Sequence, residues 1–92
     1  MLEPLFIDVV RFQIVVNLFR EKNDFVTLKE KIGISDGNLS FHLKKLEKAE
    51  IIHTEKAFSG KKVKTFVELT DSGRKKLFEH LYELENITKD IK

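Results

Sequence analysis

The chain has 92 residues, of which 41% are hydrophobic and 35% are charged, and its 17 Lys and Arg against 15 Asp and Glu leave a net charge of only +2. This length corresponds to one domain, and the composition is too apolar for a disordered chain. The chain is too short for a doubly wound enzyme with its own substrate domain, and its apolar runs fall far short of the roughly 18 residues of a membrane span. We therefore expect one domain over residues 1–92 that does not enter a membrane.

Cysteine is absent, which excludes disulfides, thiolate metal sites and thiol redox sensing. The first residues, MLEPLF, place no basic segment before an apolar stretch and so do not predict a secretory signal. Without export, the N-x-[ST] matches at Asn38 and Asn86 carry no glycosylation meaning. We expect a soluble, cytoplasmic protein.

The first predicted element is a helix over residues 9–21 with Asp8 as its N-cap. Apolar residues occupy most of its circumference, so the helix must be covered on nearly all sides. In so short a chain, we expect a second subunit to supply part of that cover.

A polar connection over residues 21–24 precedes the next predicted helix. Phe25 and Val26 are interpreted as a brief extended segment, and Thr27 as the N-cap of a short helix over residues 28–32.

The following turn contains Gly33, which is predicted to end the short helix in a left-handed conformation. Ser35 is the predicted N-cap of a helix from residue 36 to about residue 49. Two helices joined by so short a turn form a helix-turn-helix pattern.

The apolar pattern then becomes strand-like. Residues 51–58 and 63–69 are predicted strands, and residues 59–62 between them predict a hairpin turn. Thr70 is the predicted N-cap of a last helix over residues 71–88. The fold class is therefore α+β and mostly α, in the order helix, helix, helix, hairpin, helix.

The segment that carries functional information is residues 35–48, SDGNLSFHLKKLEK. Leu39, Leu43 and Leu46 share a narrow arc that must face the core, whereas the opposite face carries small residues, one aromatic ring and lysines. This distribution suits a helix that enters the DNA major groove by its N-terminus. The predicted DNA-binding residues of this helix are Ser35, Gly37, Asn38, Ser40, Phe41, Lys44, Lys45 and Lys48.

We expect Asn38 and Ser40 to hydrogen-bond base edges, Phe41 to contact thymine methyl groups, and the lysines to neutralise phosphates. A solvated amphipathic helix would explain the lysines equally well. It would not explain Phe41, a large apolar side chain on the polar face.

The net charge is unevenly distributed. Residues 35–65 contain seven basic and four acidic side chains, for a charge of +3, while residues 1–34 are neutral and residues 66–92 carry −1. The hairpin lysines predicted to bind DNA are Lys61, Lys62 and Lys64. Protection of a strand edge and solubility of the turn explain Lys61 and Lys62 equally well.

These features together resemble prokaryotic winged helix-turn-helix transcriptional regulators of the broad ArsR and MarR type. The resemblance covers about residues 8–85 and rests on the hairpin and on the strings VRFQI at residues 10–14, ISDGNLSFHLKKL at residues 34–46 and LTDSGR at residues 69–74. It implies a three-helix core, a recognition helix at residues 35–49 in the major groove, a two-stranded wing at residues 58–64 on the flanking backbone or minor groove, and a C-terminal helix.

The resemblance also implies a homodimer that reads a pseudo-palindromic operator in double-stranded DNA. We expect residues 1–7 and 71–92 to take part in dimerisation. The predicted interface residues are Leu5, Phe6, Val9, Phe12, Leu77, Leu81, Tyr82 and Leu84. An effector is left open: Phe78 and Tyr82 could line a pocket, but aromatic residues at helical spacing belong more often to a core or an interface.

The chain departs from the family pattern in two places. Relatives usually carry glycine where this chain has Glu50, which leaves open how the recognition helix ends. Metal sensors of the ArsR branch use cysteines or paired His and carboxylate ligands, whereas His42, His53 and His80 are far apart in this sequence. We therefore expect no metal and no cofactor, and interpret His42 as a half-buried structural residue.

Two other classes of function compete with DNA binding. One is a winged helix that mediates protein–protein interaction in a larger assembly, with Phe41 as the hot spot. The other is an enzyme, because GISDG at residues 33–37 matches the nucleophile-elbow pattern. That motif requires a preceding strand and a large parallel sheet, whereas Ser35 is explained as a helix cap. The glycines form no dinucleotide or Walker A motif either, so we predict no catalytic residues.

Overall fold

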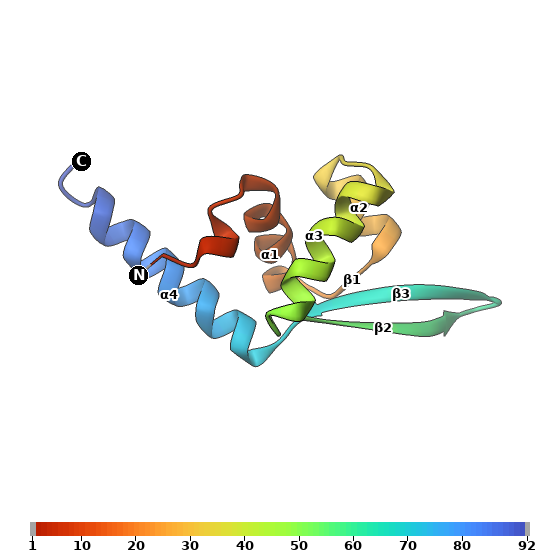
Figure 1. The fold of residues 1–92 in the computed structure, drawn as a ribbon. Helices are drawn as coiled ribbons and strands as arrows, with labels where there is room; N and C mark the ends of the chain where they lie inside the picture. The colour runs from red at the N-terminus through yellow and green to blue at the C-terminus, as the bar shows by residue number, and fades with distance from the viewer. Residues whose placement is uncertain (1, 92) are drawn as a thin grey trace.

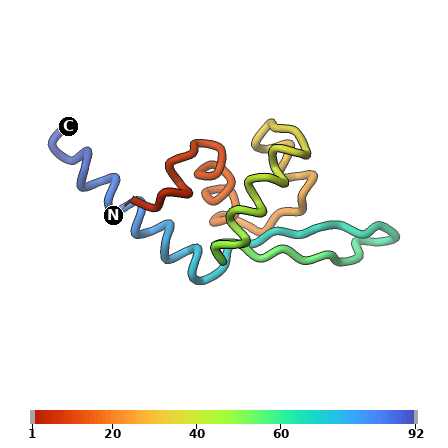
Figure 2. Tube along the Cα trace, viewed as in Figure 1, coloured from red at the N-terminus to blue at the C-terminus, as the bar shows by residue number. Residues whose placement is uncertain are grey.

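The computed structural model describes residues 2–91, in which a three-helix core carries a small antiparallel sheet and a long final helix (Figure 1). The elements in chain order are η1 (Pro4–Phe6), α1 (Val9–Arg20), β1 (Asn23–Asp24), α2 (Phe25–Ile32), α3 (Asp36–Lys48), β2 (Ile52–Ser59), β3 (Lys62–Leu69) and α4 (Asp71–Thr88). The hairpin and α4 project from opposite sides of the core, so the molecule is elongated, at 53 × 25 × 21 Å (Figure 2). Within the described residues, no helix is long and apolar enough to span a membrane.

The core forms around α1, which contacts η1, α2, α3 and β3. The predicted leucine stripe of α3 faces this core: Leu39 and Leu46 are fully buried, and Leu43 is 6% exposed. The remaining buried apolar residues are Phe6, Ile14, Val15, Leu18, Leu28, Ile51, Ile52, Val67, Leu69 and Leu77. One chain therefore supplies most of the cover that α1 requires.

The predicted helix starts are confirmed for α1, α3 and α4. Asp8, Ser35 and Thr70 each accept a hydrogen bond from a backbone N–H in the first turn of the helix that follows. Gly33 ends α2 at φ 77°, the left-handed conformation predicted for it.

The predicted start of α2 is wrong. The helix begins at Phe25, and Asp24 rather than Thr27 is its N-cap, accepting a hydrogen bond from the Thr27 N–H at 2.9 Å. The Thr27 hydroxyl donates a second hydrogen bond to the same carboxylate, at 3.0 Å. Asp is among the strongest N-cap residues, so Phe25 and Val26 become the first helical turn instead of an extended segment.

The sheet has three strands in the order β1-β3-β2, one more than the predicted hairpin. The additional strand, β1, has only two residues, Asn23 and Asp24, which pair with Val67 and Phe66 of β3. Neither Asn nor Asp favours strands, so the pairing depends on the neighbouring β3 and not on local propensity.

The hairpin is one residue longer at its tip than predicted. Ser59 pairs with Lys62, so only Gly60 and Lys61 form the turn, and Gly60 has a φ of 67°. At its base, β2 begins at Ile52, and Ile51 lies in the turn between α3 and β2.

The structure shows how α3 ends with Glu50 at the position where relatives usually carry glycine. Glu50 has a φ of 61°, the left-handed conformation that glycine adopts with the least strain. Its N–H donates to the Glu47 carbonyl at 2.9 Å, and the Ile51 N–H donates to the Leu46 carbonyl at 3.0 Å. These are the two hydrogen bonds of a Schellman motif, here formed without glycine.

The start of α4 packs directly against this motif. The Thr70 N–H donates to the Ile51 carbonyl at 3.0 Å, and the Thr70 hydroxyl is 2.6 Å from the Glu50 carbonyl oxygen. A Cβ on Gly73 would lie 2.1 Å from the Ile51 carbonyl oxygen. Two positions of the LTDSGR string therefore have a structural reason: Thr70 bonds this junction, and Gly73 allows the helix to approach it.

Candidate nucleic-acid interface

The polar face of α3 is open to solvent. Ser35 caps the helix and the leucine stripe anchors it, so the opposite face points outward. Among the residues predicted to bind DNA there, Ser40 is half-buried. The exposed ones are Ser35, Gly37, Asn38, Phe41, Lys44, Lys45 and Lys48.

Phe41 is 55% exposed on this face and has two neighbours that hold its ring. The His42 ring meets it edge-on, with centroids 5.3 Å apart, and the Lys45 Nζ lies 5.0 Å from its centroid. A cation–π contact at an exposed site contributes about 0.5–1 kcal/mol. Phe41 and Lys45 therefore form a preorganised apolar and cationic pair at the centre of the face.

His42 is half-buried behind Phe41, which confirms the prediction of a structural histidine. Its Nδ1 lies 3.2 Å from Nη1 of Arg11, whose Nε donates to the Leu5 carbonyl at 2.8 Å. Burial lowers the pKa of His42, and the Asp8 carboxylate opposes that shift. A neutral ring accepts the Arg11 hydrogen bond through Nδ1, so His42 ties α3 to the N-terminal segment.

An open groove separates α3 from the hairpin. It is lined by Phe25, Ser40, Leu43, Lys44, Glu47, Thr54, Lys56 and Thr65. The Thr54 hydroxyl donates to the Glu47 carboxylate at 2.5 Å and so links the base of the hairpin to α3. The groove brings the predicted Ser40 and Lys44 beside Lys56, a cation that sequence reasoning missed. The alternation of side chains along β2 could have identified Lys56, because Thr54 and Lys56 are two residues apart and share one face of the strand.

The three predicted hairpin lysines are exposed near its tip. Lys61 occupies the turn, and Lys62 and Lys64 lie on the opposite face of the hairpin from Lys56, because Lys56 pairs with Thr65. The Lys64 Nζ is 4.0 Å from an Asp24 carboxylate oxygen, so part of its charge is balanced within the protein. The hairpin therefore carries lysines on both faces, and Lys64 is the one of the three whose charge is partly balanced by a carboxylate.

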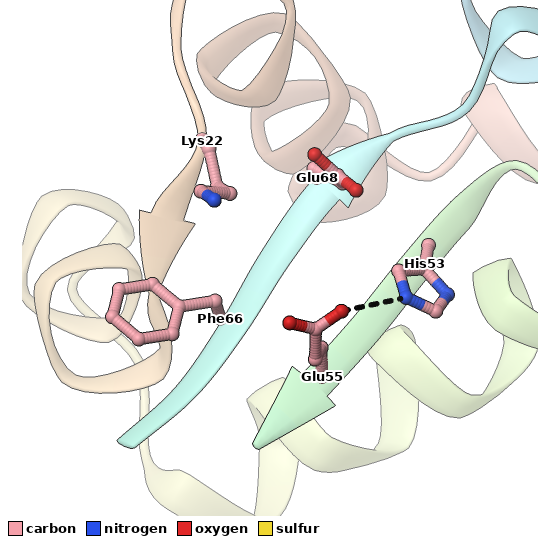
Figure 3. Close-up of a pocket in the computed structure, with 5 residues that line it drawn as sticks. All are labelled: Lys22, His53, Glu55, Phe66 and Glu68. Atoms are coloured by element: carbon pink, nitrogen blue, oxygen red, sulfur yellow. Dashed lines mark ion pairs between the residues drawn. The ribbon is translucent and has the colours of Figure 1, made fainter. Parts of the chain in front are cut away.

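The outer face of the sheet, away from α3, has a different character (Figure 3). It brings Glu55 and Glu68 beside His53, with the His53 Nε2 3.5 Å from a Glu55 carboxylate oxygen, while the Lys22 Nζ lies 5.5 Å from the centroid of the Phe66 ring. Two carboxylates disfavour a polyanion on this side. At the base of the sheet the α3 side is therefore the more favourable one for a polyanion, whereas Lys62 and Lys64 make the outer face basic nearer the tip.

The residues predicted to form a dimer interface divide into two groups. Phe6 and Leu77 are only 2% exposed and belong to the core of the single chain, so they are not available to a partner, and those two assignments are corrected. Both lie where the N-terminal segment and α4 meet the core, and sequence periodicity does not distinguish such sites from an interface. Leu5, Phe12 and Leu84 are half-buried, whereas Val9, Leu81 and Tyr82 are 66%, 39% and 63% exposed.

The fold and this basic helix-and-hairpin surface define a winged helix of the DNA-binding class. The chain belongs to the family described as winged helix DNA-binding domain, whose model matches residues 10–88. It is 39% identical over 88 residues to an uncharacterized protein of Methanocaldococcus jannaschii, with 95% of this chain and 96% of that protein covered.

Solved structures show the same fold. A transcriptional regulator homologue from Pyrococcus horikoshii OT3 superposes with a TM-score of 0.88 at 26% identity, covering 95% of this chain and 87% of that one. PadR of Bacillus subtilis, in complex with operator DNA, gives a TM-score of 0.71 at 21% identity and covers 82% of this chain and 48% of PadR. BldR of Sulfolobus solfataricus, a transcriptional regulator, gives 0.74 at 21% identity, with 89% of this chain and 58% of BldR covered.

Proposed function

We propose that this protein is a non-catalytic transcriptional regulator that binds specific sequences in double-stranded DNA as a homodimer in the cytoplasm. The observation that carries the proposal is the position of the lysine-bearing face of α3 beside a basic hairpin, on the side of the molecule away from the carboxylates Glu55 and Glu68. The family, and the PadR structure with operator DNA, support the same reading.

In the proposed complex, α3 lies in the major groove with its N-terminus toward the bases. Asn38 and Ser40 hydrogen-bond base edges and Phe41 contacts thymine methyl groups. Lys44, Lys45 and Lys48 neutralise the phosphates that flank the groove, and Lys61, Lys62 and Lys64 extend the contact along the wing.

The proposed dimer forms through α4 and the N-terminal segment. On α4, Phe78, Leu81 and Tyr82 are at least 39% exposed, and Phe78 packs edge-on against Phe19 of α1, with centroids 5.4 Å apart. Burial of such side chains stabilises an interface. A two-fold axis through this surface would place two recognition helices about 34 Å apart, one turn of DNA, and match a pseudo-palindromic operator.

Selection of bound fragments from a random DNA library tests sequence specificity, and the recovered half-site spacing tests the dimer. A fluorescence titration of the best fragment at several salt concentrations then measures the electrostatic contribution. The Lys44→Ala and Lys62→Ala variants should each weaken binding to all sequences and reduce the salt slope by about one unit. Lys89→Ala, beyond the last turn of α4, removes the same charge away from the proposed interface and should leave the slope unchanged.

Asn38→Ala and Phe41→Ala should instead change which sequences are selected, because base contacts carry specificity and phosphate contacts do not. A triple alanine variant of Lys44, Lys45 and Lys62 with wild-type affinity would refute the proposal. Binding of a protein partner with little dependence on salt would instead favour the interaction module, with Phe41 as its anchor.

A further inference from the structure

The tip of the wing carries an exposed apolar pair. Phe58 of β2 and Val63 of β3 face each other directly, one residue pair before the turn, and are 79% and 58% exposed. A cross-strand pair of this kind stabilises a hairpin only modestly relative to alanines. Covering a large apolar side chain from water stabilises more. The pair therefore gains most if a partner covers it.

The pair lies on the face of the wing that adjoins the recognition helix. Side chains alternate between the two faces of a strand, so Thr54, Lys56 and Phe58 share one face of β2. Thr54 and Lys56 line the groove against α3. Phe58 and Val63 therefore continue the proposed DNA-facing surface beyond the end of that groove.

The length of the wing determines what the pair can reach. Phe58 is four residues beyond Thr54, which is bonded to Glu47 of α3, and at roughly 3.3 Å per residue this places it about 13 Å further out. The major groove of B-DNA is about 12 Å wide. With α3 in that groove, an extension of this length is long enough to pass the phosphate backbone and meet the adjacent minor groove.

The charge around the pair fits this location. Residues 56–65, KAFSGKKVKT, contain four lysines and no acidic residue. An apolar pair with Lys56 on its own face, Lys61 in the turn and Lys62 and Lys64 on the opposite face matches a minor groove, where phosphates flank the exposed edges of the base pairs. Architectural proteins that insert apolar side chains between base steps kink the duplex by about 20–90°.

We propose that Phe58, supported by Val63, inserts between base pairs in the minor groove beside the α3 site and kinks the DNA. This inference rests on the proposed function and adds a second determinant of sequence specificity, the ease with which the DNA kinks at a given base step. TA and CA steps kink most easily, whereas A-tracts are stiff. The favoured operator therefore has a flexible step beneath each wing, outside the bases that α3 reads.

The test uses the full chain and the DNA fragment obtained by selection, labelled at both ends for fluorescence energy transfer. Wild-type protein should bend the fragment by at least about 20° and brighten a 2-aminopurine placed at the flexible step, because the base becomes unstacked. A Phe58→Ser/Val63→Thr double variant should keep the wild-type salt slope but leave the fragment straight. Lys62→Ala should lower the slope and keep the bend.

A second measurement changes only the DNA, so it does not depend on the folding of a variant. Replacing the flexible step by an A-tract should weaken wild-type binding on the order of tenfold, and should not affect the double variant. The proposed insertion of Phe58 is overturned if wild-type protein binds with a steep salt dependence while the DNA stays straight, or if the double variant bends DNA as the wild type does. Absence of any salt-sensitive DNA binding would instead refute the proposed function, and the insertion of Phe58 with it.

Discussion

Replacement of Gly73 by alanine should be among the most destabilising single changes in the chain. The added Cβ would lie 2.1 Å from the oxygen and 2.9 Å from the carbon of the Ile51 carbonyl. Both are backbone atoms, so α4 must move away. Overpacking of this kind costs about 1–3 kcal/mol. The movement also stretches the hydrogen bond from the Thr70 N–H to the Ile51 carbonyl, worth about 1 kcal/mol.

The higher helix propensity of alanine returns about 1 kcal/mol, so the net loss should be about 1–3 kcal/mol. For a domain of this size, that corresponds to a fall in Tm of roughly 4–24 °C. Thermal and urea denaturation, followed by circular dichroism, measure both quantities.

The matched control is Gly37→Ala, because Gly37 lies in the first turn of α3 as Gly73 does in α4, and a Cβ there would meet nothing within 4 Å. The control should raise stability by about 0.5–1 kcal/mol, since only the propensity term remains. If Gly73→Ala were as stable as the wild type while Gly37→Ala behaved as expected, the close approach of α4 to Ile51 would be refuted.

Three further predictions concern other parts of the molecule. Glu50→Gly should raise the free energy of unfolding by about 0.5–1 kcal/mol, because glycine adopts φ 61° without strain, and Glu50→Ala in the same denaturation assay should show no such gain. Burial lowers the pKa of His80 below its ordinary 6.5, and the Glu3 carboxylate opposes the shift. As the pH falls, the unfolded chain therefore binds the proton before the folded chain does. The free energy of unfolding should consequently fall below about pH 6.5, by at most about 1.4 kcal/mol per pH unit, until the folded-state pKa is passed. His80→Gln should reduce that dependence to the part contributed by His42, whose pKa burial also lowers, and an unchanged slope would show that His80 does not contribute to it. Leu81→Lys should convert the proposed dimer to a monomer in sedimentation equilibrium, whereas Val26→Lys, at an exposed apolar site on α2, should leave the mass unchanged, and a wild-type monomer would contradict the proposed assembly.

The features that sequence predicts well are those set within a few residues. The caps at Asp8, Ser35 and Thr70 follow from one side chain and the turn after it, and the leucine stripe of α3 follows from its period. The strand β1 is different, because Asn23 and Asp24 are extended only where β3 lies beside them. The exposed lysines of α3 were likewise readable from the sequence, whereas Lys56 becomes part of the groove only when the hairpin folds against α3.

The junction at residues 50–51 shows what local patterns could not reveal. The sequence indicated only that glycine was missing from the end of α3, whereas the structure shows one carbonyl, that of Ile51, accepting hydrogen bonds from both the backbone N–H and the hydroxyl of Thr70. The end of α3, the base of the wing and the start of α4 therefore meet at a single peptide. If α4 forms the dimer and α3 reads the DNA, this peptide sets the position of α3 relative to α4 within each chain. The packing of the two α4 helices then determines the spacing of the two recognition helices. A shift at Gly73 should consequently change the preferred half-site spacing as well as the stability, and the two effects are separable by repeating the fragment selection with the Gly73→Ala protein below its Tm.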